Sequence, residues 1–510
     1  MDITQSLEEI EKSVGHLSPV QKILLGTDGS VTQLLEAATG HTVTITTLVQ
    51  EVIWADAAVA ERLNIREGEA VNHRIVELKD AEKNEVLIYA VSQTPLSRLP
   101  PEFKEDLMRA DIPIGKIIKR HRIEARREIV SARVSPAPDE ISRIFSLCRN
   151  EPLLSRQYRI IHRGEPLIFI EEQFPYNRFL DERRVIVETP SRIHVSLIDM
   201  HGGSGRVDGG IGITLDDPRI LIEAQQSPVC EVSGCDSKTS GQIKDIATSV
   251  LEGIRAGSSV AITVRNLYPG HIGLGSGSQL ALATAQAICN LYGRTLTVPE
   301  LARFTGRGGT SGIGTAAFET GGFIIDGGHR FGPGQEKQVF APSSASRGIR
   351  PAPVIVRQDF PEDWKILLAI PSVRPGASGS READIFKQYC PVPADEVRAL
   401  CHEVLVRMLP GIVERDLDLF GSSINAVQNL GFKKVELSLQ PPQIKGLLGA
   451  MRAAGAAGAG MSSFGPALYA FGDTGMREIE RSADTFMKDW CGGITLITSA
   501  RNRGAAVRVV

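Results

Sequence analysis

A glycine- and serine-rich run between a strand-like and a helix-like segment carries the clearest chemistry in this chain. The run is Pro269-Gly-His-Ile-Gly-Leu-Gly-Ser-Gly-Ser278; Val260–Val264 precedes it and Gln279–Cys289 follows. A turn of this kind presents backbone N–H groups and the positive end of a helix dipole to a phosphate. We therefore predict a phosphate-binding loop whose ligand contacts come from Gly273, Gly275, Ser276 and Ser278.

A second candidate site combines a cation and an acid on two strand-like segments. Arg74 lies in His73-Arg-Ile-Val-Glu-Leu78, and Glu171 lies in Leu167-Ile-Phe-Ile-Glu-Glu-Gln-Phe174. A guanidinium can hold a carboxylate through two hydrogen bonds. Burial among apolar residues raises a carboxyl pKa toward the range useful for general acid catalysis. Glu172 points to the opposite strand face, so a register shift of one residue would exchange the two glutamates. The plainer alternative is an ordinary ion pair between Arg74 and Glu171 across a sheet.

The composition that must support these sites is that of a soluble globular protein with a nearly balanced charge. The 510 residues are enough for about three folding units, and 42% are apolar, 23% are charged and the net charge is −3. This balance gives no reason to expect nucleic acid as a partner. The basic run Lys116–Arg127 has apolar residues interleaved, so we interpret it as a solvated edge that helps to attract an anionic substrate.

Cysteine spacing and hydropathy point to the cytoplasm. The seven cysteines are scattered and support neither a disulfide framework nor a zinc site. No uncharged apolar run reaches the length of about 18 residues that a membrane helix needs. We therefore expect a reducing compartment and no membrane role.

Strand-period and helix-period segments divide the chain near residue 186. Before this boundary, two hairpin-like pairs, Ala70–Leu78 with Val86–Gln93 and Leu154–His162 with Leu167–Phe174, predict an antiparallel sheet with a few helices packed on it. After it, strands alternate with Gly-rich loops and helices. We predict an α+β protein with a domain at 1–185 and a two-lobed domain at 186–510, its lobes at about 186–345 and 346–510.

Most of the region 15–180 resembles chorismate pyruvate-lyase. The segments that carry the resemblance are Thr27–Gly40 with the Thr-rich strand after it, His73–Leu78 with Val91–Pro95, and Leu167–Pro175. The resemblance implies conversion of chorismate into 4-hydroxybenzoate and pyruvate, with Arg74 and Glu171 at the positions of the family's functional Arg and Glu. Ligand-sensing domains of bacterial transcription regulators share this α+β shape, but too few residues precede the matching region for a helix-turn-helix module.

The region 189–506 resembles the GHMP superfamily, and within it the β-ribofuranosylaminobenzene 5′-phosphate synthases of methanopterin biosynthesis. The resemblance is carried by Gly-rich motifs at 189–203, 205–212, 269–278, 306–315, 458–466 and 500–505. It implies that a para-substituted benzoate joins phosphoribosyl pyrophosphate with loss of CO₂ and pyrophosphate. It also implies ligand contacts from motif residues Ser311, Gly312, Ser462, Ser463 and Asn502.

Two departures from the kinase pattern argue against phosphoryl transfer. The kinase motif G-x-S-G-x-D falls on Gly309–Gly314, so Gly314 stands where the kinases carry the Asp that activates the acceptor hydroxyl. The kinase loop ends in two serines, whereas Gly277 takes the second place here and Ser278 follows. Both departures fit a synthase that holds a diphosphate as a leaving group.

The synthase reaction also needs Mg²⁺ at the leaving group and a carboxylate near developing positive charge. We predict Asp199 as the acid that stabilises the cation or binds Mg²⁺, with Ser278 as a second metal ligand. Arg206 is the predicted cation for a phosphate or for the benzoate carboxylate, and Asp208 is a second candidate acid. The plainer alternative is that Asp199 and Asp208 cap turns beside glycines.

Together, the two halves predict a bifunctional enzyme in which the first half makes the benzoate that the second half consumes. We expect small-molecule substrates (chorismate, phosphoribosyl pyrophosphate and either 4-hydroxybenzoate or 4-aminobenzoate), Mg²⁺ as cofactor, and an archaeal, cytoplasmic homodimer that binds neither nucleic acid nor membrane. Two alternatives stay open: a GHMP-type small-molecule kinase with an attached aromatic-acid-binding domain, and a non-enzymatic aromatic-acid sensor. The residues do not decide which of the two benzoates is the acceptor.

Overall fold

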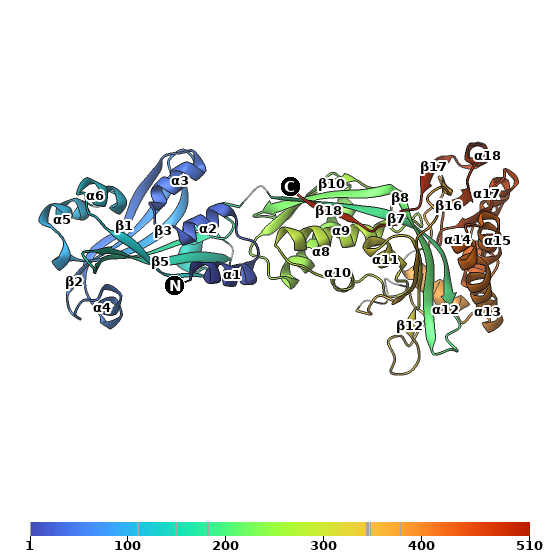
Figure 1. Cartoon of the computed structure of the whole chain (residues 1–510), viewed down its shortest axis with the longest axis horizontal. Coiled ribbons are helices and arrows are strands. Elements are labelled where there is room, and N and C mark those ends of the chain that lie inside the picture. The colour runs from blue at the N-terminus through green and yellow to red at the C-terminus, as the bar shows by residue number, and fades with distance from the viewer. Residues whose placement is uncertain are drawn as a thin grey trace. The chain divides into compact units, whose positions relative to one another are not determined.

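The chain forms two compact units (Figure 1), and each is described by itself. The computed structural model describes residues 2–109, 112–147, 151–180, 183–342, 346, 348–377 and 379–510. Unit 1 comprises Met1–Arg183 with 226–229 and 255–260, and unit 2 comprises 184–225, 230–254 and 261–510. The boundary predicted between residues 185 and 186 lies two residues beyond the observed one between 183 and 184.

Unit 1 is built on a six-stranded antiparallel sheet with the strand order β1-β2-β3-β6-β5-β4. The two hairpins predicted from the alternating pattern are confirmed: β2 pairs with β3 and β5 pairs with β6, each antiparallel. The strands are β1 (Val43–Trp54), β2 (Ala70–Asp80), β3 (Glu85–Pro95), β4 (Arg126–Pro136), β5 (Pro152–His162) and β6 (Glu165–Pro175).

Short amphipathic helices pack their apolar sides on this sheet. In one core cluster, Phe103 and Leu107 of α5 and Ile117 of α6 pack with buried residues of β5 and β6, among them Tyr158 and Ile170. The helices of unit 1 are α1 (Ile3–Val14), α2 (Pro19–Gly26), α3 (Val31–Thr39), α4 (Ala57–Leu63), η1 (Leu96–Arg98), α5 (Pro101–Met108), α6 (Ile114–Arg120) and α7 (Asp139–Phe145).

The larger sheet of unit 2 is organised around the long antiparallel pair β7–β8. Its path runs β13-β11-β8-β10-β9, and β7, β12 and β18 join it beside that path. The helices α8–α11 lie along one side of it (Figure 1). The elements are β7 (Arg184–Asp199), β8 (Arg206–Ser227), β9 (Glu231–Ser233), α8 (Ser237–Gly253), β10 (Ser259–Asn266), α9 (Ser276–Leu291), α10 (Val298–Thr305), α11 (Ile313–Glu319), β11 (Phe323–Asp326), β12 (His329–Arg330), β13 (Val354–Gln358) and β18 (Ala506–Val509).

A second, four-stranded sheet with the order β15-β16-β14-β17 is covered by helices. Its core joins Leu367 and Ala369 of β14 to apolar residues of α17 and α18. The elements are β14 (Lys365–Pro371), α12 (Ser380–Tyr389), α13 (Ala394–His402), η3 (Glu403–Met408), α14 (Leu409–Glu414), α15 (Leu417–Val427), α16 (Gly431–Ser438), α17 (Pro442–Ala453), β15 (Gly458–Met461), β16 (Leu468–Gly472), α18 (Met476–Trp490) and β17 (Gly493–Ser499).

The prediction of lobes at 186–345 and 346–510 assumed that each lobe of unit 2 is one continuous stretch of sequence. The strand pairing of the two sheets does not follow this division. Two strands from the second stretch return to the first sheet: β13 pairs with β11, and β18 pairs with β7. Both pairings join residues that are far apart in the chain. Local periodicity, on which the prediction rested, does not report such pairings.

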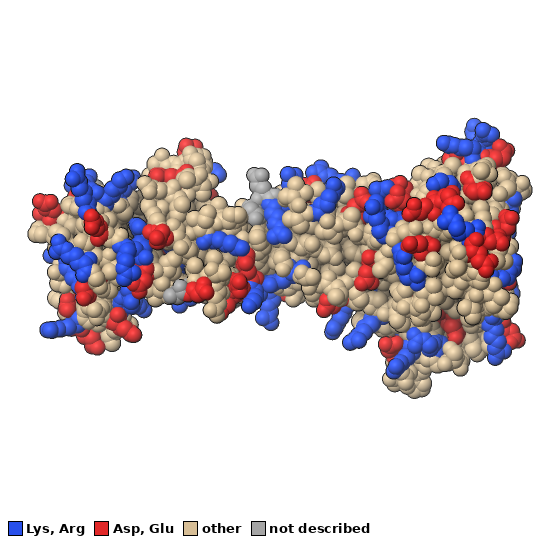
Figure 2. All heavy atoms as spheres, in the orientation of Figure 1, with Lys and Arg blue, Asp and Glu red and all other residues tan. Residues whose placement is uncertain are grey.

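Charged side chains of both signs are interspersed on the face drawn in Figure 2, as the net charge of −3 leads one to expect. In the part of the chain that the structure describes, no helix is long and apolar enough to cross a membrane.

Candidate active sites in the two units

Unit 1 holds a cavity between the sheet and the helices α3 and α6. It encloses about 620 Å³ of empty space, including its open mouth. Most of its wall is apolar, and the polar groups that converge on it include two arginines, a tyrosine and one glutamate. These four residues are Arg74, Arg127, Tyr158 and Glu172.

Arg74, the cation predicted to hold a substrate carboxylate, reaches this cavity from β2. Its side chain is buried, and it donates hydrogen bonds to the carbonyl of Ile112 (3.0 Å) and to the hydroxyl of Thr47 (3.1 Å). These contacts hold the guanidinium in a fixed orientation at the cavity wall.

The glutamate in the cavity wall is Glu172, which corrects the prediction of Glu171. Glu172 is buried and accepts hydrogen bonds from Arg156 Nε (2.7 Å) and the Tyr158 hydroxyl (3.1 Å). Glu171 does not line the cavity and instead pairs with Arg133 (3.2 Å). Successive strand residues face opposite sides of a sheet, so the cavity takes one glutamate and the other face takes its neighbour.

Tyr158 ties the acid to the cavity wall. Burial, followed by the negative charge of Glu172, raises the pKa of the Tyr158 phenol. The phenol therefore stays protonated and acts as a donor to the Glu172 carboxylate.

Arg127 is a cavity residue that the sequence interpretation missed. It ends the basic run that we interpreted as a solvated edge, yet it lines the cavity and donates to the carbonyl of Asp28 (2.9 Å). Its position at the start of β4 could have indicated a side chain that faces the sheet's cavity side. Which arginine of the basic run faces inward, however, depends on the strand's register.

The pocket of unit 2 surrounds the predicted phosphate loop. It holds about 1150 Å³ of empty space, including open solvent. Its lining includes five predicted residues, namely Gly273, Gly275, Ser276, Ser278 and Ser463.

The loop has this shape because two of its glycines take left-handed backbone angles next to other groups. Gly273 has φ +94°, and a Cβ there would lie 2.3 Å from the carbonyl oxygen of Ser462. Gly275 has φ +85°, and its Cβ would lie 3.2 Å from the side chain of Arg192. Only glycine fits such positions without strain. Gly275 caps the N-terminus of α9, a helix buried along most of its length, so that helix end faces the pocket.

Two arginines that were not predicted flank the loop. Arg192 of β7 donates to the carbonyl of Gly273, and burial lowers the pKa of Arg192 to about 10, which leaves it cationic at neutral pH. Arg307 also lines the pocket, and its Nη1 would be 3.7 Å from a Cβ on Gly277. Arg192 lies in the Gly-rich motif at 189–203 and Arg307 in the one at 306–315, but only the fold brings them to one pocket.

Ser462 and Ser463 join the loop to β7. The Ser462 hydroxyl donates to the carbonyl of Gly273 (2.7 Å) and accepts the N–H of His194 (2.9 Å). The backbone N–H of Ser463 donates to the carbonyl of His194 (2.9 Å). Ser463 therefore lines the pocket, while Ser462 holds the loop in place.

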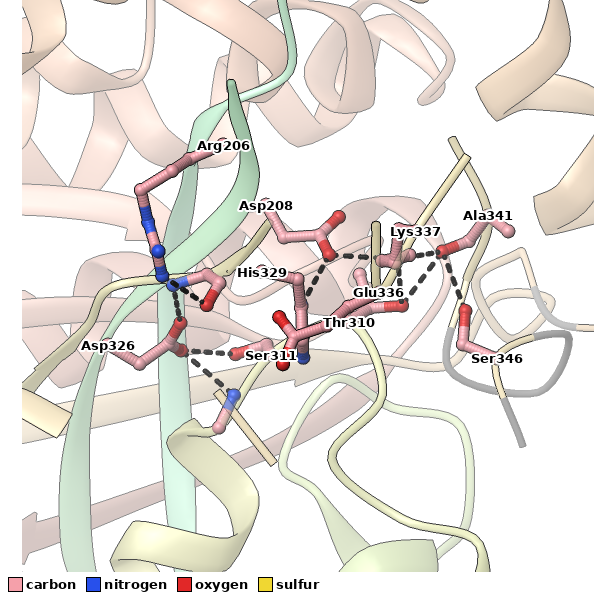
Figure 3. Close-up of polar contacts among 12 residues, drawn as sticks. Arg206, Asp208, Thr310, Ser311, Asp326, His329, Glu336, Lys337, Ala341 and Ser346 are labelled. Carbon is pink, nitrogen blue, oxygen red and sulfur yellow. Dashed lines mark hydrogen bonds and ion pairs between the residues drawn. The ribbon is translucent and has the colours of Figure 1, made fainter. Parts of the chain in front are cut away.

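Ser311 and Gly312 lie outside the pocket lining and hold a buried carboxylate (Figure 3). The Ser311 hydroxyl (3.2 Å) and the Gly312 N–H (2.9 Å) both donate to Asp326 Oδ2. Burial raises the pKa of Asp326 to about 6 against the opposing effect of these hydrogen bonds. The contact of Ser311 Oγ with His194 Nε2 (3.2 Å) links this group to β7.

Asp208 is neither a turn cap nor a pocket acid but the centre of a buried polar cluster (Figure 3). Its Oδ2 accepts from Lys337 Nζ and contacts His329 Nδ1, each at 2.8 Å. Lys337 also donates to the carbonyl of Ala341 (3.0 Å). The cluster fastens the segment after β12 to β8, and the Thr310 hydroxyl joins it by donating to the carbonyl of Ala341 (2.8 Å).

Asp199 and Arg206 lie at the turn between β7 and β8 and not in the pocket lining. Asp199 accepts the N–H groups of His201 and Gly202 and the hydroxyl of Ser204, each at 2.9 Å, so it caps this turn as the plainer alternative held. Arg206 donates to the carbonyls of Gly327 and Gly328, both at 2.8 Å (Figure 3 shows its position).

Asn502 also lies outside the pocket lining. Its side chain accepts the N–H of Phe360 (2.8 Å) and donates to the carbonyl of the same residue (3.0 Å). It therefore ties the segment before β18 to the segment before β14.

The two predicted metal ligands, Asp199 and Ser278, differ in how well their surroundings suit a metal ion. The Asp199 carboxylate is occupied by hydrogen bonds from His201, Gly202 and Ser204 of its own turn, so it does not fit as a metal ligand. Ser278 lines the pocket and fits as a hydroxyl donor beside a diphosphate. Among the residues that the structure describes, no group of three or more His, Cys, Asp or Glu is placed to hold a metal ion by itself.

Comparison with known proteins gives each unit a class that agrees with its site. A family model described as chorismate pyruvate-lyase Rv2949c-like matches residues 25–180. Models of the N-terminal and C-terminal domains of GHMP kinases match 239–322 and 408–488. The chain thus joins a chorismate pyruvate-lyase-like domain to a GHMP-type domain, as the two resemblances predicted.

The chain belongs to the β-ribofuranosylphenol 5′-phosphate synthase family. It is 47% identical to the synthase of Methanocaldococcus jannaschii over 331 residues, which cover 63% of this chain and 99% of that protein. The Methanothermobacter thermautotrophicus synthase is 44% identical over 328 residues, covering 63% and 98%. In the other part, the chorismate pyruvate-lyase of Mycobacterium leprae is 26% identical over 181 residues, covering 36% of this chain and 84% of that protein.

Proposed function

We propose that this chain is a bifunctional enzyme of methanopterin biosynthesis. Unit 1 converts chorismate into 4-hydroxybenzoate and pyruvate. Unit 2 condenses 4-hydroxybenzoate with phosphoribosyl pyrophosphate and releases CO₂ and pyrophosphate. The observation that carries the proposal is the fusion itself, because the product expected of one unit is the substrate expected of the other.

The cavity of unit 1 suits a substrate with two carboxylates. Arg74 and Arg127 both line it, and each guanidinium can hold one carboxylate of chorismate. Glu172 faces the same space and supplies the group that moves a proton as pyruvate leaves.

The pocket of unit 2 suits a diphosphate that leaves rather than one that is transferred. The backbone of the loop and the N-terminus of α9 face the pocket, and the cations Arg192 and Arg307 flank it. Ser278 would hold Mg²⁺ beside the diphosphate, and the ion would supply charge neutralisation to this cradle.

The relatives favour 4-hydroxybenzoate over 4-aminobenzoate as the acceptor. Their name describes a ribofuranosylphenol product, and a phenol retains the hydroxyl of 4-hydroxybenzoate. Unit 1, as a chorismate pyruvate-lyase, would make that compound.

The kinase alternative has a steric argument against it. Gly314, which replaces the kinase Asp, is buried, and a Cβ there would lie 3.2 Å from Cβ of Ser278. An aspartate would therefore crowd the loop serine, and phosphoryl transfer would still lack its base.

The proposal is tested by incubating the protein with chorismate, phosphoribosyl pyrophosphate and Mg²⁺ while pyruvate and pyrophosphate are measured. Both should appear, and EDTA should suppress pyrophosphate alone. Tight binding of 4-hydroxybenzoate without either product would favour the sensor alternative, and release of ADP from ATP with a polar metabolite would favour the kinase. A competition between the two benzoates decides the acceptor.

The proposal includes a cytosolic, archaeal homodimer. The archaeal source is supported by the two synthases compared above, which come from archaea. Light scattering of the purified chain would give the number of subunits.

A further inference from the structure

The pocket of unit 2 has one carboxylate among the described residues that line it. This is Glu382, near the start of α12, in the same pocket as the phosphate loop. Its side chain is half-buried, and in the described part of the chain no hydrogen bond or ion pair occupies its carboxylate. A carboxylate in a diphosphate pocket opposes ligand binding electrostatically, so its presence calls for a chemical role.

The surroundings of Glu382 prepare it to exchange a proton near neutral pH. Burial, and then the negative charge of Glu436, raise the pKa of Glu382 to about 7. Glu436 is itself buried and paired with Lys433 of the same helix, α16. The charged and titratable groups that face the pocket from the other elements are Arg192 of β7, Tyr268 and His271 of the loop before α9, and Arg307 after α10.

The other groups of the pocket are less suited to this exchange. Burial raises the pKa of the Tyr268 phenol, whose hydroxyl donates to the carbonyl of Leu274 (3.2 Å). His271 is exposed at the rim of the loop. Arg192 and Arg307 are cations that do not accept protons at neutral pH.

The proposed condensation needs such an exchange at one atom of the acceptor. The ring carbon that bears the carboxylate must attack the anomeric carbon of the donor, and the ring becomes strongly nucleophilic there only as the para hydroxyl loses its proton. The carbon–carbon bond forms, the carbon–oxygen bond to pyrophosphate breaks, and pyrophosphate leaves with that electron pair. The ring is then a dienone that carries both ribose and carboxylate on one carbon.

We propose that Glu382 is the general base that takes the phenolic proton during attack and returns it when CO₂ departs. In the second step the bond to the carboxylate breaks, its electron pair restores the aromatic ring, and the dienone oxygen recovers the proton from Glu382. No net proton is consumed, and the carboxylate ends as it began. This assignment rests on the proposed function of unit 2.

The test compares Glu382→Gln with Asp384→Asn, an exposed change on the same helix that lies outside the pocket lining. With 4-hydroxybenzoate supplied, kcat for pyrophosphate release should fall about 100-fold or more in Glu382→Gln, the size of a lost general base. KM for phosphoribosyl pyrophosphate should not rise, and Asp384→Asn should match the parent chain. Glu382→Asp, which keeps a carboxylate, should recover part of the rate.

Two readouts separate a base from a residue that only shapes the pocket. Because the base acts in its deprotonated form, kcat of the parent chain should fall about tenfold per pH unit below pH 7, and Glu382→Gln should lose this limb. With 3-fluoro-4-hydroxybenzoate, whose phenol ionises more readily, Glu382→Gln should lose much less activity than with the unsubstituted acid.

The outcomes separate failure of the Glu382 assignment from failure of the proposed function of unit 2. If the parent chain releases pyrophosphate and Glu382→Gln does so equally fast, or with the same pH limb, the base is another group and the proposed function stands. A uniform loss with both acceptors also overturns the base assignment. If the parent chain releases no pyrophosphate at all, the proposed function of unit 2 itself is wrong.

Discussion

Glu171 and Glu172 are neighbours in the chain, yet the pleat of β6 gives them different surroundings. At the cavity wall, Glu172 accepts one hydrogen bond from the Arg156 guanidinium and one from the Tyr158 hydroxyl. Glu171 pairs with Arg133 on the other face. Glu172 is therefore the one of the two that faces the cavity, and Glu171 provides a matched control.

We expect Glu172→Gln to lower the rate of pyruvate release from chorismate by about 100-fold, since a proton-transfer group is lost from the cavity. Glu171→Gln should stay within a few-fold of the parent chain because its side chain does not reach the cavity. Coupling pyruvate to lactate dehydrogenase measures both. Equal losses in the two variants would contradict the placement.

Asn502 gives a second prediction for a single residue. Its two hydrogen bonds to Phe360 are structural, so Asn502→Ala should lower the free energy of unfolding by about 1–3 kcal/mol without changing KM for either substrate. Thermal unfolding and steady-state kinetics check it, with the exposed Asn429→Ala as control. A raised KM in a variant of unchanged stability would restore Asn502 to the binding site.

At the scale of elements, the phosphate loop depends on backbone contacts as much as on its serines. Gly273 approaches Ser462 so closely that a methyl group would have to displace the segment between β15 and β16. Gly293 also has a positive φ, but a Cβ there meets nothing within 4 Å. The two glycines thus separate backbone strain from close approach.

Gly273→Ala should reduce pyrophosphate release by about 100-fold, because displacement of a reacting group by 1 Å can cost that much. Gly293→Ala carries only the strain of a left-handed residue, about 1–2 kcal/mol, and should keep its activity. Pyrophosphate assays with supplied 4-hydroxybenzoate, run beside circular dichroism, test the pair. Similar activity in both folded variants would contradict the loop contact.

Elements with strong local periodicity were predictable, and groups defined by distant contacts were not. The two hairpins of unit 1 and the loop before α9 follow from alternation and glycine spacing. The choice between Glu171 and Glu172 depends on which strand face meets the helices. Asp199 shows the opposite difficulty, because an aspartate beside glycines has the same sequence pattern whether it caps a turn or binds a ligand. Arg192, Arg307 and Glu382 meet only in the folded chain.

At the scale of the whole molecule, each unit has its own cavity, with a lining drawn from that unit alone. The two reactions therefore need not share any group. Loss of one should leave the other intact.

Arg74→Met keeps most of the apolar stem and removes the cation. We expect pyruvate release to fall by about 100-fold or more, as for the loss of one partner of a buried charged pair. Pyrophosphate release with supplied 4-hydroxybenzoate should be unchanged, which also reports that unit 2 is folded. Loss of both activities in folded protein would contradict the two-site arrangement.

The pairing of β18 with β7 sets an order of events during synthesis. Residues 506–509 complete the edge of the sheet that residues 185–188 begin, so this edge stays open while more than three hundred intervening residues are made. Unit 1 draws nearly all of its residues from before Arg184 and can fold as it emerges from the ribosome. The synthase unit must wait with an unpaired edge exposed, a hazard for aggregation. Removal of residues 506–509 should therefore harm yield and solubility before it harms any chemistry.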